Sequence, residues 1–176
     1  NFLGRLPTPI RLRAMWVLQT LNKTISESWL SDPDEHIRAW VIRLMMDDQP
    51  IDTLFGPREK AILTIYPEFV QKLVQQAQMD SSGLVRLTLA SSLQRLSVES
   101  RGELAKALAS RTEDKKDRNL PLVVWAGIVP LVEKDPNDLI EIARLTEWAN
   151  LRAWIARAIT ERSKEHPVVF DDLLKL

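Results

Sequence analysis

The sequence predicts an all-α fold, wound as a right-handed superhelix of about four to five helical hairpins. Strand-like alternation is rare and only five Gly occur, while apolar residues recur at helical spacing along the chain. A motif also occurs twice: residues 37–43 (IRAWVIR) and 151–157 (LRAWIAR) share Arg, Ala and Trp in the same order, with a second Arg five residues after the first. Such self-similarity is typical of repeat arrays, in which each unit buries its apolar face against its neighbours.

The two repeated motifs carry the clearest helical pattern. In each helix five apolar residues follow the spacing i, i+3, i+4, i+7 and i+8, from Ile37 to Met45 and from Leu151 to Ile159. Looser matches predict the remaining helices, with boundaries uncertain by about 2–4 residues. In order, helices are predicted near residues 8–21, 24–31, 33–46, 67–79, 83–96, 99–111, 119–133, 136–146, 148–163 and 167–176.

Several helix ends follow from local chemistry. The segments 32–35 (DPDE) and 135–138 (DPND) each offer an Asp N-cap, Pro at the first helical position and an acid in the first turn. Pro130 is expected to kink or stop the helix over 119–133, because it lacks an amide donor and crowds the preceding turn. Residues 47–66 read as irregular, with room for a short helix around 57–64.

The spacing of the units predicts their family of fold. Five points taken as equivalent lie 25 to 48 residues apart, around the range of HEAT and armadillo repeats of roughly 30–47 residues. These points are Arg13, Arg38, Arg86, Pro121 and Arg152. The sequence therefore predicts a single HEAT-like α-solenoid domain over residues 1–176, with 8–21 as a second helix and 167–176 as a first helix of broken hairpins. Because initiator Met is absent, we expect a fragment of a larger multidomain protein.

Composition excludes several classes of function. Lys plus Arg and Asp plus Glu both total 24, so the net charge is zero, which disfavours nucleic acid as partner. Cysteine is absent, which excludes thiolate metal sites and cysteine nucleophiles. Without cysteine, the sequence does not indicate whether the protein lies in an oxidising or a reducing cell compartment. No apolar run approaches the ~20 residues that cross a bilayer. His36 and His166 each follow a Glu, but no second His lies four residues away, so a metal site is not predicted.

Arginine and tryptophan supply the candidate site residues. Arg38, Arg86 and Arg152 follow an acidic or amide residue at a helix start, and we expect them to form a structural ladder by reaching the turn of the adjacent unit. The alternative is a row of exposed guanidinium groups that binds phosphate or carboxylate. Of the six Trp, core packing is expected for 16, 40, 125 and 154, whereas Trp148 begins its helix beside Glu147 and is the candidate exposed contact.

Segment 117–131 (DRNLPLVVWAGIVPL) is more distinctive than the helical spacing alone. Together with 32–40 and 85–96, it resembles the HEAT-repeat region of large bacterial haem-binding, membrane-bound dehydrogenase-type proteins. The resemblance implies a β-propeller, a HEAT array and a cytochrome c module in the parent protein, and a periplasmic or other extracytoplasmic setting. Haem c would belong to that parent, because this segment has no Cys. No cofactor, metal or catalytic residue is predicted here.

We therefore expect a non-catalytic scaffold that binds a protein or neighbouring domains of the same chain. Two other interpretations stay open: a HEAT-type nucleic-acid enzyme resembling the alkylpurine DNA glycosylases, and a protein resembling the HEAT-type bilin lyases. Salt-dependent binding to duplex DNA would favour the first of these, and an absorbance change on adding chromophore would favour the second.

Overall fold

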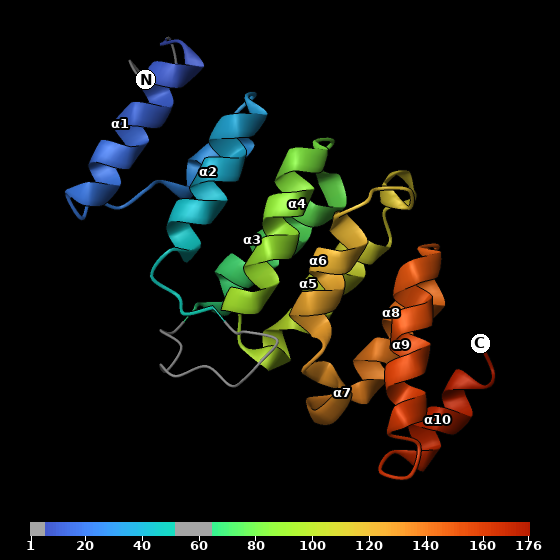
Figure 1. Ribbon diagram of the computed structural model, residues 1–176. Coiled ribbons are helices and arrows are strands. Elements are labelled where there is room, and N and C mark those ends of the chain that lie inside the picture. The colour runs from blue at the N-terminus through green and yellow to red at the C-terminus, as the bar shows by residue number, and fades with distance from the viewer. Residues whose placement is uncertain (1–5, 52–64) are drawn as a thin grey trace.

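The computed structural model of the chain describes residues 6–51 and 65–176 (Figure 1). Those residues form helices and turns, with no strand among them, which confirms the all-α prediction. The α-helices are α1 (Thr8–Thr20), α2 (Glu35–Met46), α3 (Pro67–Met79), α4 (Gly83–Ser92), α5 (Arg101–Ala109), α6 (Leu120–Ile128), α7 (Leu131–Lys134), α8 (Pro136–Leu145), α9 (Ala149–Glu161) and α10 (Pro167–Leu173). Short 3-10 turns complete them: η2 (Glu27–Ser31), η3 (Leu93–Arg95), η4 (Val98–Ser100) and η5 (Thr112–Asp114).

The predicted helices match these elements closely, and the differences have local causes. The helix expected over 24–31 is only the 3-10 turn η2, and the one expected over 119–133 divides into α6 and α7 at Pro130. At the start of α2 the N-cap is Asp34 and not Asp32, because the Asp34 side chain accepts the His36 amide at 2.8 Å. Asp135 is the N-cap of α8, as predicted. The short helix expected around 57–64 lies outside the described residues.

The helices lie in two layers (Figure 1). The front layer contains α1, α2, α4, α6 and α9, each packed against the next in that order. The back layer contains α3, α5, α8 and α10, again packed in chain order. Each of α3, α5 and α8 leads through a turn into its front-layer partner, so that three consecutive helix pairs lie side by side, and η2 takes the place of a back helix behind α2.

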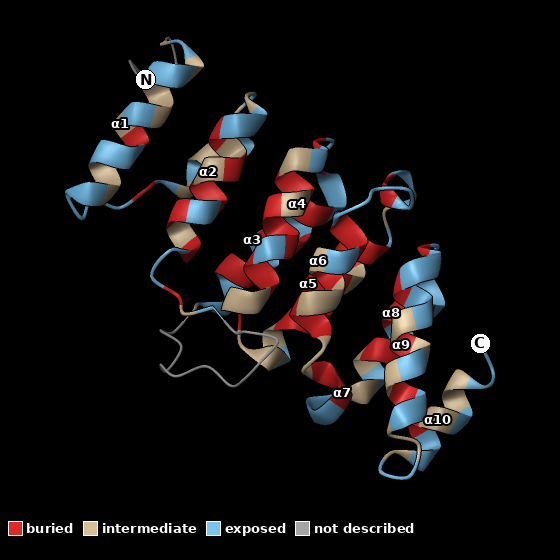
Figure 2. Ribbon diagram, viewed as in Figure 1, coloured by how far each residue is buried: buried red, intermediate tan, exposed pale blue. Residues whose placement is uncertain are grey.

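The core lies between the two layers and runs along the whole described molecule (Figure 2). Buried side chains recur every three or four residues on the inward side of each helix, as in Leu73 and Ala77 of α3 and Val85 and Leu89 of α4. Each helix buries one apolar stripe against its pair and its neighbours. The opposite side of each helix faces away from this core.

The back layer is also tied together by charge. Lys106 of α5 lies 2.8 to 3.0 Å from carboxylates of Glu103 and Asp138 and 2.7 Å from Glu141, the last two on α8. Burial lowers the pKa of Lys106, but the hydrogen bonds to these three carboxylates outweigh it and raise the pKa above its ordinary value. The cluster therefore links α5 to α8, and its one ammonium group is already paired.

Gly127 sets the distance between α6 and the end of α4. A Cβ at Gly127 would lie 2.5 Å from the Cβ of Leu93. Because the Leu93 Cβ is bound to the backbone of η3, relief requires the two helices to separate. We expect Gly127→Ala to lower the free energy of unfolding by about 1–3 kcal/mol, despite the higher helix propensity of Ala.

Urea unfolding followed by circular dichroism measures this difference. The matched control is Gly83→Ala in α4, where the added Cβ would meet only Arg86 Nη2 at 3.9 Å. We expect the control to change stability by less than about 0.5 kcal/mol. Equal stability of Gly127→Ala and the unmodified chain would contradict the close packing of α6 on η3.

Candidate functional site

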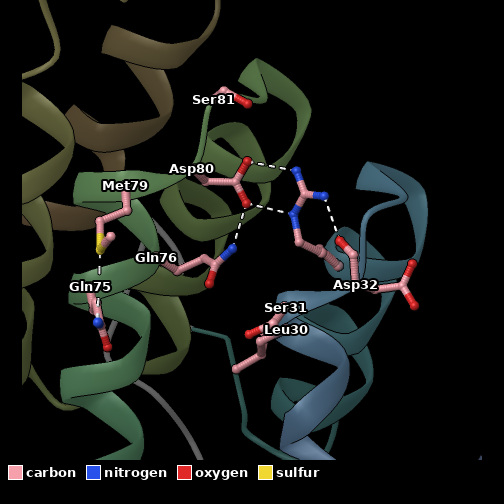
Figure 3. A pocket seen from close by; sticks show the side chains of 9 residues that line it. Leu30, Ser31, Asp32, Gln75, Gln76, Met79, Asp80 and Ser81 are labelled. Carbon is pink, nitrogen blue, oxygen red and sulfur yellow. Dashed lines mark hydrogen bonds and ion pairs between the residues drawn. The ribbon is translucent and has the colours of Figure 1, made fainter.

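Arg38 of α2 connects its own turn to the turn of the next helix pair (Figure 3). Its Nε and Nη2 donate to the two carboxylate oxygens of Asp80 at 2.7 and 2.8 Å, and Nη1 donates to the Asp32 carbonyl at 2.8 Å. Asp80 directly follows α3, so the ion pair joins the second pair of helices to the first. Such two-pronged Arg–carboxylate bonds fix geometry as well as charge.

Arg86 of α4 repeats this arrangement one unit further along. Its Nε and Nη2 donate to the carboxylate of Asp114 at 2.5 and 2.7 Å, and Nη1 donates to the Asp80 carbonyl at 2.8 Å. The side chains of Arg86 and Asp114 are only 4% and 9% exposed, against 12% and 2% for Arg38 and Asp80, so both ion pairs are largely buried. The two arginines thus form successive rungs of one arginine ladder.

A third rung lies at Arg11 of α1, which donates to the carboxylate of Asp32. Arg11, Arg38 and Arg86 are each the fourth residue of their helix. The structure therefore corrects the expected equivalences: Arg11 takes the place given to Arg13, and Val123, the fourth residue of α6, takes the place given to Pro121. Arg13 is exposed, because it lies two residues, about 200°, further around the helix.

The ladder is interrupted between α6 and α9. There Val123 stands in place of the arginine, and Thr146, which directly follows α8 as Asp80 follows α3, stands in place of the aspartate. Both halves of the ion pair are thus replaced by neutral side chains. A buried charge without its partner would be costly, so the two replacements compensate each other.

Arg152 is the fourth residue of α9 and does not form the expected rung. Its side chain is exposed and makes no ion pair with the residues that the structure describes. The reason is positional: each rung runs to the turn that precedes the next front-layer helix, and within the described residues no front-layer helix follows α9. Of the three predicted ladder residues, Arg38 and Arg86 reach a neighbouring turn.

A hollow of about 430 Å³ lies beside the Arg38–Asp80 pair, between η2 and α3 (Figure 3). The ion pair at its wall is already saturated, because the Asp80 carboxylate also accepts the Gln76 amide and the Ser82 backbone amide. A saturated ion pair has little left to offer a ligand. We therefore interpret this hollow as part of the scaffold. It is lined by Leu30, Ser31, Asp32, Arg38, Gln75, Gln76, Met79, Asp80 and Ser81.

The Asp80 carboxylate makes the stability of the fold depend on pH in the acid range. Burial raises the pKa of Asp80, but hydrogen bonds from Arg38, Ser82 and Gln76 outweigh it, so the pKa lies below its ordinary value. A lowered folded-state pKa gives stability that is complete above the unfolded pKa of about 3.9 and is lost as pH falls through the folded value. We expect the urea concentration at the unfolding midpoint to decrease as the pH is lowered below about 4. In Asp80→Asn this decrease should be less steep. An equally steep acid dependence in Asp80→Asn would contradict this assignment.

Trp148 was expected to be exposed, and this is wrong. The residue is 1% exposed, and its Nε1 donates to the Arg111 carbonyl at 2.8 Å. The turn between α5 and α6 covers the start of α9, a contact between residues distant in sequence. Trp148 is therefore a structural residue and not a ligand contact.

The core packing expected for four Trp is confirmed in part. Trp40, Trp125 and Trp154 are half-buried against the core, and Trp16 is 38% exposed. Trp16 and Trp40 stack edge to face with ring centres 5.0 Å apart, and Trp125 and Trp154 lie 6.4 Å apart. These indoles pack along the surface of the layer, between neighbouring helices.

Helix α6 presents an apolar surface in the middle of the front layer. Its sequence, LPLVVWAGI, contains no charged or hydrogen-bonding side chain except the Trp125 indole. Leu122 is 54% exposed, and Val123, Trp125 and Ala126 beside it are partly buried. A helix that is apolar all round is normally buried on every side. We call these four residues the α6 patch.

A second hollow, of about 530 Å³, crosses α2, α4 and the edge of the α6 patch. Trp40 and Arg43 line it from α2, Thr88 and Ser91 from α4, and Val123 from α6. Met46, Asp47, Ile51, Ser92, Gln94 and Arg95 complete the lining. We call this the Thr88 hollow. It combines apolar walls with guanidinium groups.

The described residues offer neither a metal-binding cluster nor a membrane-spanning helix. In the described part of the chain no group of three or more His, Asp or Glu side chains could hold a metal ion. His36 is exposed and His166 is half-buried. Among the helices described, none combines the length and the apolar character needed to span a bilayer.

Compared with known proteins, the chain matches no family model, and neither a curated protein nor a solved structure matches it significantly. Its resemblance to the HEAT-repeat region of haem-binding dehydrogenase-type proteins therefore stays a prediction. Function has to be inferred from the α6 patch, the Thr88 hollow and the ladder.

Proposed function

We propose that the chain is a HEAT-like α-solenoid that acts as a non-catalytic scaffold and binds a protein segment on its front layer. The solenoid is supported by the regular register of the helix pairs: each front-layer helix packs on the next, and the fourth residue of α1, α2 and α4 is an arginine that bonds the following turn. Four pairs, η2–α2, α3–α4, α5–α6 and α8–α9, follow this order, with α1 and α10 as single helices at either side.

The α6 patch is the single observation that carries the proposed binding function. An apolar helix surface that faces water is unfavourable, and contiguous exposed apolar patches mark interaction sites. Trp125 and the neighbouring Trp154 add aromatic area, which is enriched at the centre of protein interfaces. The surface therefore suits a partner that contributes apolar side chains of its own. In a parent protein of the haem-binding type, that partner would be a neighbouring domain.

A random-peptide library displayed on phage and selected on the immobilised chain tests this function. We expect enriched peptides whose affinity falls about tenfold or more in Leu122→Glu, which places a charge at the centre of the α6 patch. The matched control is Leu145→Glu, at the end of α8 in the back layer, where the leucine is 39% exposed. Failure to enrich any peptide, or equal binding to both variants, would overturn the proposal.

Because arginine is concentrated in the front layer, binding of nucleic acid to this chain should be tested directly. The front-layer helices carry seven Arg against two Glu, whereas the back-layer helices carry four basic and six acidic residues. Three of the seven Arg are paired within the ladder. A fluorescent DNA duplex at about 50 mM and 200 mM salt separates the two partner classes. We expect no binding at the lower salt, and salt-dependent binding would favour the DNA-enzyme interpretation instead.

A further inference from the structure

The sixth residue is a Trp in three of the five front-layer helices: Trp40 in α2, Trp125 in α6 and Trp154 in α9. It is Arg13 in α1, at the end of the layer, and Thr88 in α4, which lies between α2 and α6. The three indoles pack along the outer side of the layer, half-buried. In α4 the small Thr88 side chain turns to its own helix and donates to the Leu84 carbonyl at 2.9 Å.

The Thr88 hollow lies where the missing indole would pack. It is bounded by Trp40 on one side and by Val123 of the α6 patch on the other. The α4 residues that line it, Thr88, Ser91 and Ser92, all have small side chains. The hydroxyl groups of all three donate to carbonyls of α4 at 2.9 to 3.0 Å, so none of their hydrogens needs an acceptor on a ligand. The volume of about 530 Å³ is ample for one large side chain.

The charges at the hollow favour an anion. The Arg43 guanidinium lies over the Trp40 ring, 5.2 Å from its centre, and is exposed. Arg43 forms no ion pair with any described residue, in contrast to the ladder arginines. Arg95 also lines the hollow, and its Nη1 donates to the carbonyls of Met46, Asp47 and Gln49 at and just after the end of α2. Asp47 is the one acidic side chain among the lining residues, against these two arginines.

We infer that the Thr88 hollow is the anchor site of the protein segment that binds the front layer. The hollow takes one large apolar side chain of the segment, packed between Trp40 and Val123, and Arg43 binds a carboxylate next to that side chain. The partner is thus a segment in which an aromatic or leucine side chain is flanked by Asp or Glu. An apolar anchor in a pocket, with a charged contact at its rim, is the usual anatomy of a strong binding site. This inference rests on the proposed function, since it identifies the chemistry of the segment bound beside the α6 patch.

Two substitutions on exposed positions test the anchor and the charge separately. Ser91→Trp fills the hollow from its exposed edge, and Arg43→Glu reverses the charge. The control for the first is Thr160→Trp on α9, because Thr160 is also exposed and also donates to the carbonyl four residues earlier. The control for the second is Arg13→Glu, on an exposed arginine of α1. Circular dichroism and thermal unfolding establish that all four variants are folded.

The probe is a fluorescent copy of a peptide selected from the phage library, and fluorescence polarisation gives its affinity. We expect the selected peptides to be enriched in Asp or Glu beside Trp, Phe or Leu. Ser91→Trp and Arg43→Glu should each weaken binding about tenfold or more, while Arg43→Lys, Thr160→Trp and Arg13→Glu change it less than about threefold. A peptide with alanine in place of its anchor residue should bind the unmodified chain about as weakly. Ser91→Trp should weaken the binding of that alanine peptide little further, because both changes remove the same contact.

Failure of this inference can be told apart from failure of the proposed function. Peptides that lose affinity in Leu122→Glu, but not in Ser91→Trp or Arg43→Glu, would overturn the anchor site and leave the scaffold function standing. Enrichment of Lys and Arg beside the anchor would overturn the assigned charge of the partner. Binding that is indifferent to Leu122→Glu as well would remove both proposals. Capture of the DNA duplex that is lost in Arg43→Glu, with no peptide enriched, would overturn the inference in favour of nucleic acid.

Discussion

Arg86→Ala is expected to lower the free energy of unfolding by about 3–5 kcal/mol, because it leaves the buried Asp114 carboxylate without its ion-pair partner. The guanidinium also donates to the Asp80 carbonyl, so two turns lose a contact at once. Urea unfolding at neutral pH measures the loss. The matched control is Arg152→Ala, at the same position of α9, where the exposed side chain pairs with no described residue. We expect the control to change stability by less than about 0.5 kcal/mol.

A double replacement separates the cost of the unpaired charge from the value of the pair. Arg86→Met combined with Asp114→Leu removes both charges and keeps apolar volume, which is often neutral or stabilising for a buried pair. We expect the double variant to be more stable than Arg86→Ala. If it is equally unstable, the arginine acts mainly through its bond to the Asp80 carbonyl. If Arg86→Ala is as stable as the unmodified chain, the ladder does not hold the helix pairs together.

Trp148→Ala is expected to lower the free energy of unfolding by about 3–5 kcal/mol, since it removes the largest fully buried side chain. Trp148→Phe keeps much of the apolar volume but loses the hydrogen bond to the Arg111 carbonyl. The smaller loss expected for Trp148→Phe, about 1–2 kcal/mol, includes the carbonyl left without its donor. Thermal and urea unfolding measure both variants. A marginal effect of Trp148→Ala would mean that the turn between α5 and α6 does not cover the start of α9.

The positions of the helices could be predicted because their causes are local. Apolar residues at helical spacing and Asp-Pro punctuation placed most helices within a few residues of their observed ends. The Asp34 cap was missed by two residues because segment 32–35 offers two aspartates, and only the geometry of the turn selects between them. Element type thus depends on nearby residues, while the choice of cap depends on the path of the chain.

The candidate site was harder to predict, because its causes lie in other units of the fold. Sequence spacing could single out Arg38 and Arg86, but their partners Asp80 and Asp114 lie 42 and 28 residues away. The burial of Trp148 depends on Arg111, which is 37 residues away. The Thr88 hollow follows from a residue that is small where its equivalents in α2, α6 and α9 are Trp, which becomes apparent once the helices are aligned by their first residue. The equivalences expected from sequence were two residues out of phase in α1 and in α6, at Arg13 in place of Arg11 and at Pro121 in place of Val123.

The interruption of the ladder at Val123 and Thr146 limits how units of this molecule can be exchanged. Excision of the α3–α4 unit would bring Arg38 to face Asp114, a matched pair, so the shortened chain keeps a continuous set of charges. Excision of the α5–α6 unit would instead bring Arg86 to face Thr146, which leaves a buried guanidinium without an ion-pair partner. Shortening is therefore tolerated at one junction and penalised at the next, and any modular redesign has to move arginine and acceptor together.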